Sequence, residues 1–409
     1  MIEAPFFPIV FVSPAAAAPN DPFLGFNAAT LHSQGHLAPY QGMVLSLIHE
    51  HGYTPSYLAE VASGDRSLWF HADTSGALRD RAEALEAYLA QICAATCSDD
   101  PVAREGFKVI LIGHGAGALT ARACAQDTEL VDKLVLLGWD HHDDDPADAR
   151  YALGFDGTAP LNHTNQRYDC DRALCIYGAQ SGRACLSDAA SAAVSGSDAE
   201  LPSSAAAYRC TERFLFGDVR VDLRLVLEDC EAPKGAENAT TSFVLESTIA
   251  LRGAPRPLQQ RCTATGTAGC ASLDQLKRGR SLGSVFLANA GRVQRRRQGL
   301  GFGLDLRLIA HHRDEGAPYR DEFFANQALW ADGLQIDVVG DSGSFKLLYR
   351  FASAAGRKSC EVTIDSLAGC SRASIPIERK ASPKCTGRVE LVIQHWNKPE
   401  GDYLVLVNG

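Results

Sequence analysis

The chain contains the stretch Phe107-Lys108-Val109-Ile110-Leu111-Ile112-Gly113-His114-Gly115-Ala116-Gly117-Ala118-Leu119. Its apolar and β-branched residues before the first glycine predict a buried strand. The glycines predict a sharp turn, and the alanine-rich residues 118–125 predict a helix that follows at once. A strand, a sharp turn and a helix form the context in which a G-x-S-x-G motif presents a nucleophilic serine. The middle position here is Gly115, and glycine has no side chain that could attack a substrate.

Length, composition and charge limit the class of protein. With 409 residues, of which 46% are hydrophobic, the chain is long enough for two or three globular domains. The net charge of −10 and the sequence pI near 5.6 argue against binding to nucleic acid, which needs clustered lysine and arginine. No apolar run approaches the roughly 20 residues that span a membrane. No leader segment precedes the first predicted strand, so we expect any signal peptide to have been removed.

The 13 cysteines indicate an oxidising compartment. Cys124 lies among alanines in the helix after the turn, where we expect a buried free thiol. The other cysteines divide evenly between the two halves of the chain, as a disulfide framework requires. The spacings Cys262–Cys270 and Cys360–Cys370 suit staples within hairpins, and no closely paired zinc ligands are present in the sequence. We therefore expect disulfides, no metal, and a secreted or periplasmic protein.

Before about residue 215, the sequence alternates between apolar strands and alanine-rich helices. Such alternation predicts parallel strands joined by helical crossovers. The predicted strands cover residues 8–12, 109–112, 133–138 and 172–177, and the predicted helices cover residues 40–51 and 75–95. Residues 178–207 are small, polar and rich in turn formers, and we expect them to form a long surface loop.

After residue 215 the helical periodicity ends. Residues 219–225 alternate strictly between apolar and polar side chains, as do residues 304–308 and most of residues 389–393. This period of two predicts half-buried antiparallel strands. We therefore expect two domains: a mostly parallel α/β sheet with flanking helices over residues 1–212, and an all-β sandwich over residues 213–409.

Residues 5–205 resemble the bacterial lipases and esterases of the α/β-hydrolase family. The resemblance depends on several elements that occur in the same order as in that family. They are the strand Pro8–Val12, the helix end Leu45–Tyr53, the turn Gly113–Gly117, the strand end Leu136–His142 and the segment Ser197–Ala205. The last segment is similar to the family's S-D-G-x-V-P-x-x-S, whose aspartate orients the catalytic histidine. The resemblance therefore implies an α/β-hydrolase-like sheet and gives Asp198 the position of the triad aspartate.

The chain departs from the family at the groups that perform the chemistry. Gly115 replaces the nucleophilic serine. Ser13-Pro14 replaces the His-Gly of the oxyanion loop, and proline has no N–H to donate. The resemblance leaves the backbone N–H groups of Ala15 and Ala116 as oxyanion donors, in a pocket beside His114. The expected site is therefore an anion-friendly pocket without an attacking atom.

The histidine of the family's triad should follow Asp198 within a few tens of residues, and none does. In a serine hydrolase the histidine takes the serine proton, and the aspartate orients the imidazole. Loss of the serine or the histidine alone lowers turnover by about 10⁶, nearly as much as loss of the whole triad. We therefore interpret the first domain as a catalytically inactive hydrolase-like domain without a cofactor, which binds a protein partner or a small apolar or acyl ligand.

Two other interpretations remain open at this point. Gly113-x-Gly115-x-x-Ala118, between a strand and a helix, also fits the dinucleotide-binding fingerprint, in which bare backbone approaches a pyrophosphate. That motif needs an acidic residue about 20 residues on, and Asp140 lies several positions later. Alternatively, the domain is an active lipase or carboxylesterase with a rearranged catalytic set, in which His311, His312 or His395 serves as the base.

The segment Asp140–Asp145 combines four aspartates with two histidines, a mixture that can bind divalent metals. The segment follows the end of a predicted strand and is itself followed by Pro146, so we expect a solvated loop and no metal site. In the lipases this segment lines the mouth of the active site. Its charge therefore disfavours a fatty-acyl pocket.

Overall fold

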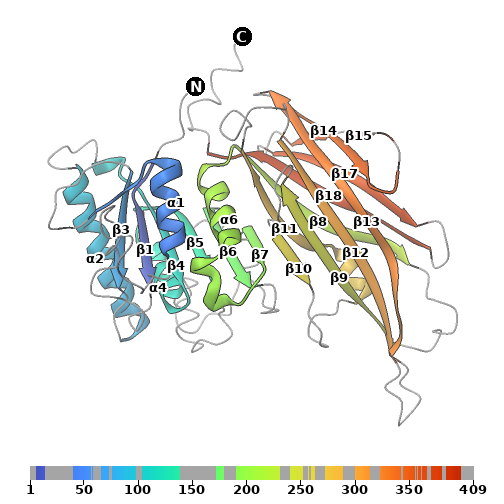
Figure 1. Ribbon diagram of the computed structural model, residues 1–409, viewed down its shortest axis with the longest axis horizontal. Helices are drawn as coiled ribbons and strands as arrows, with labels where there is room; N and C mark the ends of the chain where they lie inside the picture. Colours follow the sequence, from blue (N-terminus) through green and yellow to red (C-terminus); the bar gives the residue numbers. More distant parts are fainter. Residues whose placement is uncertain are drawn as a thin grey trace. The chain divides into compact units, whose positions relative to one another are not determined.

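The chain forms two compact units in the computed structural model (Figure 1). The first unit comprises residues 1–191 and 196–211, and the second comprises residues 192–195 and 212–409. The structure describes residues 6–13, 40–56, 58, 66–72, 76–97, 104–138, 172–178, 190–230, 240–251, 257, 259–262, 272–288, 300–313, 323–341, 344–354, 356, 358–360, 362–365, 370–379 and 384–397.

One sheet of seven strands contains the strands of the first unit, although the last three residues of its seventh strand are grouped with the second unit. Its strands are β1 (Ile9–Ser13), β2 (Thr54–Pro55), β3 (Ser67–Ala72), β4 (Val109–His114), β5 (Val131–Leu137), β6 (Ala173–Gly178) and β7 (Ala190–Val194). They lie in the spatial order β2-β3-β1-β4-β5-β6-β7, and the strands from β2 to β6 in that order pair in parallel. The parallel α/β sheet predicted from the sequence is therefore confirmed, and its four predicted strands are β1, β4, β5 and β6.

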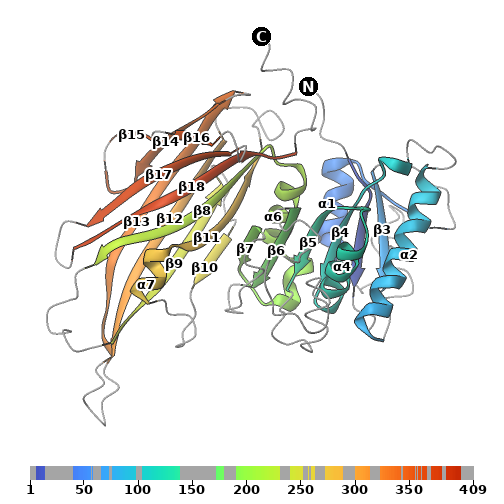
Figure 2. The same cartoon turned by 180° about the vertical axis from the view of Figure 1, so that it is seen from behind.

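Helices cover both faces of this sheet (Figures 1 and 2). On one face, α2 (Leu78–Cys97) and α4 (Ala116–Asp127) share a core with Val10, Val12 and Leu111. On the other face lies α1 (Gln41–His51), and the ring of Tyr40 at its start lies 4.9 Å from the ring of Phe11. Strands that are covered on both faces carry continuous apolar runs, which is why β1 and β4 were recognisable in the sequence.

The prediction of a surface loop over residues 178–207 is wrong in its second half. Residues 190–194 form β7, which is buried at four of its five positions. A short 3-10 helix, η4 (Asp198–Ser203), follows it, and the helix α6 (Ala205–Phe216) comes next. Three of the five residues in β7 are alanine, which has a low preference for strands. The sheet buries this segment although its own sequence does not favour a strand.

The second unit contains two antiparallel sheets. The first, in spatial order, contains β10 (Gln259–Cys262), β9 (Thr240–Leu251), β12 (Leu300–Arg313), β13 (Phe323–Asp341), β14 (Ser344–Phe351) and β15 (Lys358–Cys360). The second contains β11 (Arg280–Leu287), β8 (Val219–Cys230), β18 (Cys385–His395), β17 (Cys370–Arg379) and β16 (Val362–Asp365). A short helix, α7 (Leu273–Arg278), precedes β11.

Burial alternates along the strands of the second unit. In β12, Leu304 and Leu306 are buried, whereas Asp305 and Arg307 are exposed. In β18, every second residue from Cys385 to Ile393 is buried. The antiparallel strands predicted from period-two patterns are therefore confirmed in β8, β12 and β18. Among the helices that the structure describes, none combines the length and the hydropathy that crossing a membrane requires.

Candidate functional site

The strand order of the first unit points to one edge of the sheet as the candidate binding edge. The chain leaves β1 toward β3 on one side, returns to the other side of β1 as β4, and then continues outward to β7. The order therefore reverses between β1 and β4. In open α/β sheets, ligands bind beyond the carboxyl ends of the strands where this reversal occurs. The turn after β4, which the sequence singled out, lies at this edge.

The backbone of this turn is fixed in an unusual conformation. Gly115 has φ 53° and ψ −123°, a combination that residues with a side chain rarely adopt. Its N–H donates to the carbonyl of Leu137 at 3.0 Å, and its own carbonyl accepts from the N–H of Ala118 at 3.0 Å. The turn is thus a sharp strand-to-helix connection, and the glycine at its central position adopts this conformation without the strain that a Cβ would cause.

Close packing between α4 and β1 explains why the next glycine of the motif, Gly117, has no side chain. A Cβ atom on Gly117 would overlap the carbonyl oxygen of Val12 in β1. Helix α4 therefore lies directly against the carboxyl end of β1. This requirement holds whether or not the turn performs any chemistry.

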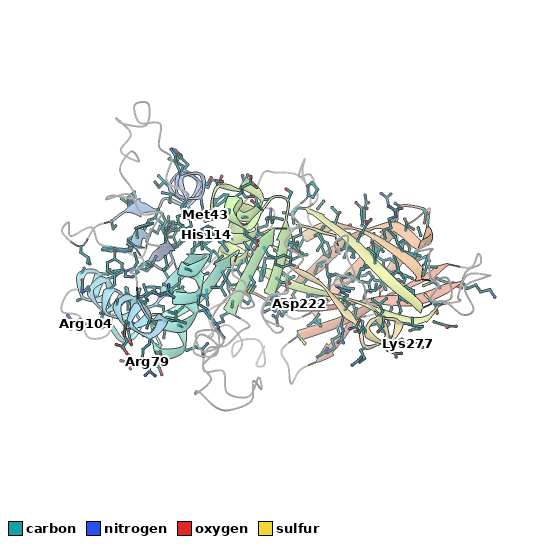
Figure 3. All side chains as sticks on the ribbon, turned by 90° about the horizontal axis from the view of Figure 1, so that it is seen from below. Met43, Arg79, Arg104, His114, Asp222 and Lys277 are labelled. Carbon is teal, nitrogen blue, oxygen red and sulfur yellow. The ribbon has the colours of Figure 1, made fainter. Side chains whose placement is uncertain are left out.

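His114 is the last residue of β4 and is partly buried. Its Nε2 lies 3.1 Å from the backbone carbonyl oxygen of Asp198, to which the ring N–H donates. Burial lowers the pKa of His114, while the hydrogen bond to Asp198 and the charge of that residue oppose the change. The imidazole is therefore neutral at pH 7. Figure 3 labels this side chain in the first unit.

The carboxylate of Asp198 is also bound to backbone. Its Oδ1 accepts the N–H of Gly178 at the end of β6, at 2.6 Å. Asp198 opens η4, where Ser197 and Glu200 form a capping box. The structure thus brings together His114 and Asp198, two residues that the sequence selected, but the contact is between the ring and a main-chain oxygen. The carboxylate itself holds the end of β6.

Tyr40 lies at the carboxyl end of β1, beside the candidate site, and the sequence did not single it out. Its hydroxyl donates to the carbonyl of Val12 at 3.1 Å, the same oxygen that Gly117 approaches. Burial raises the pKa of Tyr40, and a hydrogen bond with Ser13 opposes this only in part. Tyr40 and the buried Ser13 close the carboxyl end of β1. No short motif signals this contact, because the two partners are 28 positions apart.

Only part of the predicted oxyanion site and none of the acidic segment 140–145 lies among the described residues. Ala116 begins α4 and is exposed. Ala15 and the segment 140–145 lie outside the described residues.

The three histidines that were proposed as substitute bases all belong to the second unit. His311 and His312 lie within β12, opposite Ser242 and Thr241 of β9. The ring of His395, at the end of β18, lies 4.6 Å from the ring of Phe345. That one of these histidines serves the site of the first unit stays a prediction.

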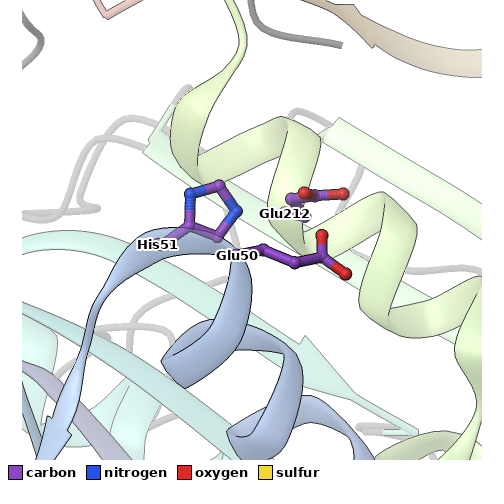
Figure 4. A group of neighbouring side chains, drawn as sticks. All are labelled: Glu50, His51 and Glu212. Atoms are coloured by element: carbon purple, nitrogen blue, oxygen red, sulfur yellow. The ribbon is translucent and has the colours of Figure 1, made fainter. Parts of the chain in front are cut away.

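Figure 4 shows Glu50 and His51, at the end of α1, together with Glu212, which belongs to the second unit. The first unit supplies only two of these three side chains. Arg209 already binds one of them, since its guanidinium lies 3.0 Å from Glu50. We therefore assign no metal site to the first unit here.

The structure describes the following cysteines as thiols: Cys93, Cys97, Cys124, Cys175, Cys210, Cys230, Cys370 and Cys385. Cys124 is fully buried, as expected, and burial raises the pKa of its thiol. Cys370 is described as a thiol and the state of Cys360 is not among those described, so the hairpin staple expected between them stays a prediction.

No protein-family model matches this chain, and no curated protein matches it.

Proposed function

We propose that the first unit is a catalytically inactive domain of the α/β-hydrolase type and that the chain acts by binding. In this proposal the second unit is a β-sandwich, and the protein is secreted or periplasmic. The observation that carries the proposal is the turn at Gly115. Its backbone has the sharp form of a nucleophile elbow, with φ 53°, and its central residue has no side chain.

The neighbouring side chains support this proposal. A serine hydrolase needs an imidazole that accepts the serine proton and a carboxylate that orients the imidazole. Here the ring of His114 bonds to a main-chain carbonyl, and the carboxylate of Asp198 accepts a main-chain N–H. Both groups thus serve the local structure. A proton acceptor must lie within hydrogen-bond reach of the group it deprotonates, and Gly115 offers no such group.

The proposed binding surface is the carboxyl end of β4 with the first residues of α4. Ala116 is exposed, and neither it nor Gly115 has a side chain that would cover the backbone. A carboxylate or carbonyl oxygen could therefore approach the N–H groups at the start of this 12-residue helix. This chemistry fits a small acyl ligand or a peptide segment of a protein partner.

The test is hydrolysis of 4-nitrophenyl acetate and butyrate by the full chain, together with labelling by a fluorophosphonate. We expect rates equal to buffer and no labelled serine. Calorimetry with butyrate as the probe would then measure binding, which Ala116→Asp should weaken because it adds a negative charge at the helix start. Hydrolysis that disappears in His114→Ala or Asp198→Asn would overturn the proposal and favour an esterase with a rearranged catalytic set.

A second candidate is dinucleotide binding through Gly113-x-Gly115-x-x-Ala118. The observation in its favour is the bare backbone of Gly115 at the point where the strand order reverses. Calorimetry with NAD and ADP, together with the colour of the purified protein, separates this function from the first. Micromolar binding of NAD or ADP would replace the hydrolase-like interpretation.

A further inference from the structure

Cys230 and Cys385 face each other in the second unit. Cys230 is the last residue of β8, and Cys385 is the first residue of β18. The two strands are antiparallel, and these residues are direct cross-strand partners. Opposed residues in such strands have Cα atoms about 4.5–5.5 Å apart, which lies within the range of about 4.4–6.8 Å found in disulfides.

A β-bulge creates this alignment. From Val219 to Leu227, odd-numbered residues of β8 face odd-numbered residues of β18. The register shifts by one residue between Thr386 and Gly387, so that Glu228 is the extra residue in β8. Beyond this point Cys385 faces an even-numbered residue, Cys230, and not Asp229. The bulge therefore places both cysteines on the same face of the sheet.

The two thiols already interact. Cys385 is buried and Cys230 is partly buried. Two causes raise the pKa of the Cys230 thiol: its hydrogen bond with Cys385, which has the larger effect, and its burial. The other strand beside β18 places Arg379 opposite Cys385, and the cysteine of that strand, Cys370, faces Gln394 and Asp365. Cys385 thus has two described cross-strand partners, Cys230 and Arg379, and of these Cys230 is the cysteine.

We propose that Cys230 and Cys385 form a cross-strand disulfide when the protein meets a disulfide oxidant. The thiolate of Cys230 attacks the oxidant RSSR, which releases RS⁻ and gives a mixed disulfide. The thiolate of Cys385 then attacks the Cys230 sulfur and releases the second RS⁻. The two thiols are oxidised, their protons pass to the released thiolates, and the oxidant becomes two RSH.

This bond would connect β8 and β18, which are neighbours in one sheet and are the first and last strands of the second unit in chain order. The two cysteines are 155 positions apart in the sequence. Closing so long a loop restricts the unfolded chain strongly. The proposal does not depend on the proposed binding function of the first unit, because both cysteines belong to the second.

Mass spectrometry of the full chain tests the pairing directly. The folded protein is incubated with oxidised glutathione, its remaining thiols are alkylated in denaturant, and it is digested with trypsin without reduction. We expect the peptides 225–234 and 385–388 to be joined, and to separate on reduction. Alkylated Cys230 and Cys385, persistent glutathione on either of them, or joining of either to another cysteine would overturn the proposal.

Thermal unfolding gives a second measurement. Oxidation should raise the melting temperature by about 5–15 °C in the wild type. It should raise it equally in Cys370→Ser, the matched control in the same sheet, and not in Cys230→Ser or Cys385→Ser. An equal rise in all four proteins would overturn the assignment. If a serine variant does not fold, the peptide map of the wild type decides alone.

Discussion

The turn after β4 in the first unit and the bulged end of β8 in the second use irregular backbone in opposite ways. At the turn, Gly115 has a positive φ and no side chain that could react, while His114 and Asp198 bond to main-chain groups. At the bulge, one extra residue brings Cys230 opposite Cys385, so that two reactive side chains meet. An irregular backbone therefore indicates chemistry only when the side chains it positions can react.

The largest effect should come from the glycine that packs α4 against β1. Gly117→Ala should lower the free energy of unfolding by about 3 kcal/mol, because the new Cβ overlaps the Val12 carbonyl oxygen. The matched control is Gly42→Ala in α1, whose Cβ would meet no atom within 4 Å. The control should be stabilising by about 0.5–1 kcal/mol. Equal urea midpoints for the two variants would show that packing does not fix the turn.

A smaller loss should follow from removing the Asp198 carboxylate. Asp198→Ala leaves the buried N–H of Gly178 without this acceptor, which should cost about 2 kcal/mol in urea unfolding. Asp198→Asn retains an acceptor and should cost less. Both variants should leave the hydrolysis of 4-nitrophenyl acetate unchanged. If stability is unaffected while hydrolysis falls, the carboxylate has a catalytic role and the comparison between the two regions fails.

Lys133 is a buried, ionisable side chain near the amino end of β5, whereas the turn at Gly115 lies at the carboxyl end of β4. It tests whether a buried group away from the turn affects stability. Burial lowers the pKa of Lys133 from 10.5 to about 8. Between pH 8 and 10.5 the unfolded chain therefore binds a proton that the folded chain does not, and the free energy of unfolding rises with pH over this range. Lys133→Met should lose this rise and should be about 1–2 kcal/mol more stable at pH 7.

The control for this variant is Lys108→Met, whose ammonium group donates to the Glu129 carbonyl in an exposed contact at 2.6 Å. Its unfolding free energy, measured with urea from pH 7 to 10, should keep the pH dependence of the wild type. If Lys133→Met also keeps that dependence, Lys133 is not the group that titrates.

Much of the fold could be predicted from the sequence. Continuous apolar runs identified β1 and β4, and alternation identified β8, β12 and β18. The failures occurred where local sequence and burial disagree. The alanines of β7 resemble a loop, although the sheet buries them.

The residues of the candidate site were selected from the sequence, but their contacts could not be derived. Gly115, His114 and Asp198 were all selected from motifs. That the ring of His114 meets the carbonyl of Asp198, and not its carboxylate, depends on how the ends of β4 and β6 approach each other. Tyr40 and the pair Cys230–Cys385 depend on contacts between distant segments and on a bulge, which residue spacing does not encode.

The most direct test restores the missing side chain. Gly115→Ser should cost about 1 kcal/mol of stability, because serine must adopt φ 53°. We expect this variant, like the wild type, to hydrolyse 4-nitrophenyl butyrate no faster than buffer, since the imidazole of His114, beside the turn, donates to the main-chain carbonyl of Asp198. Clear turnover by Gly115→Ser that is lost again in the double variant with His114→Ala would contradict the account, because it would show an acid–base system that still works.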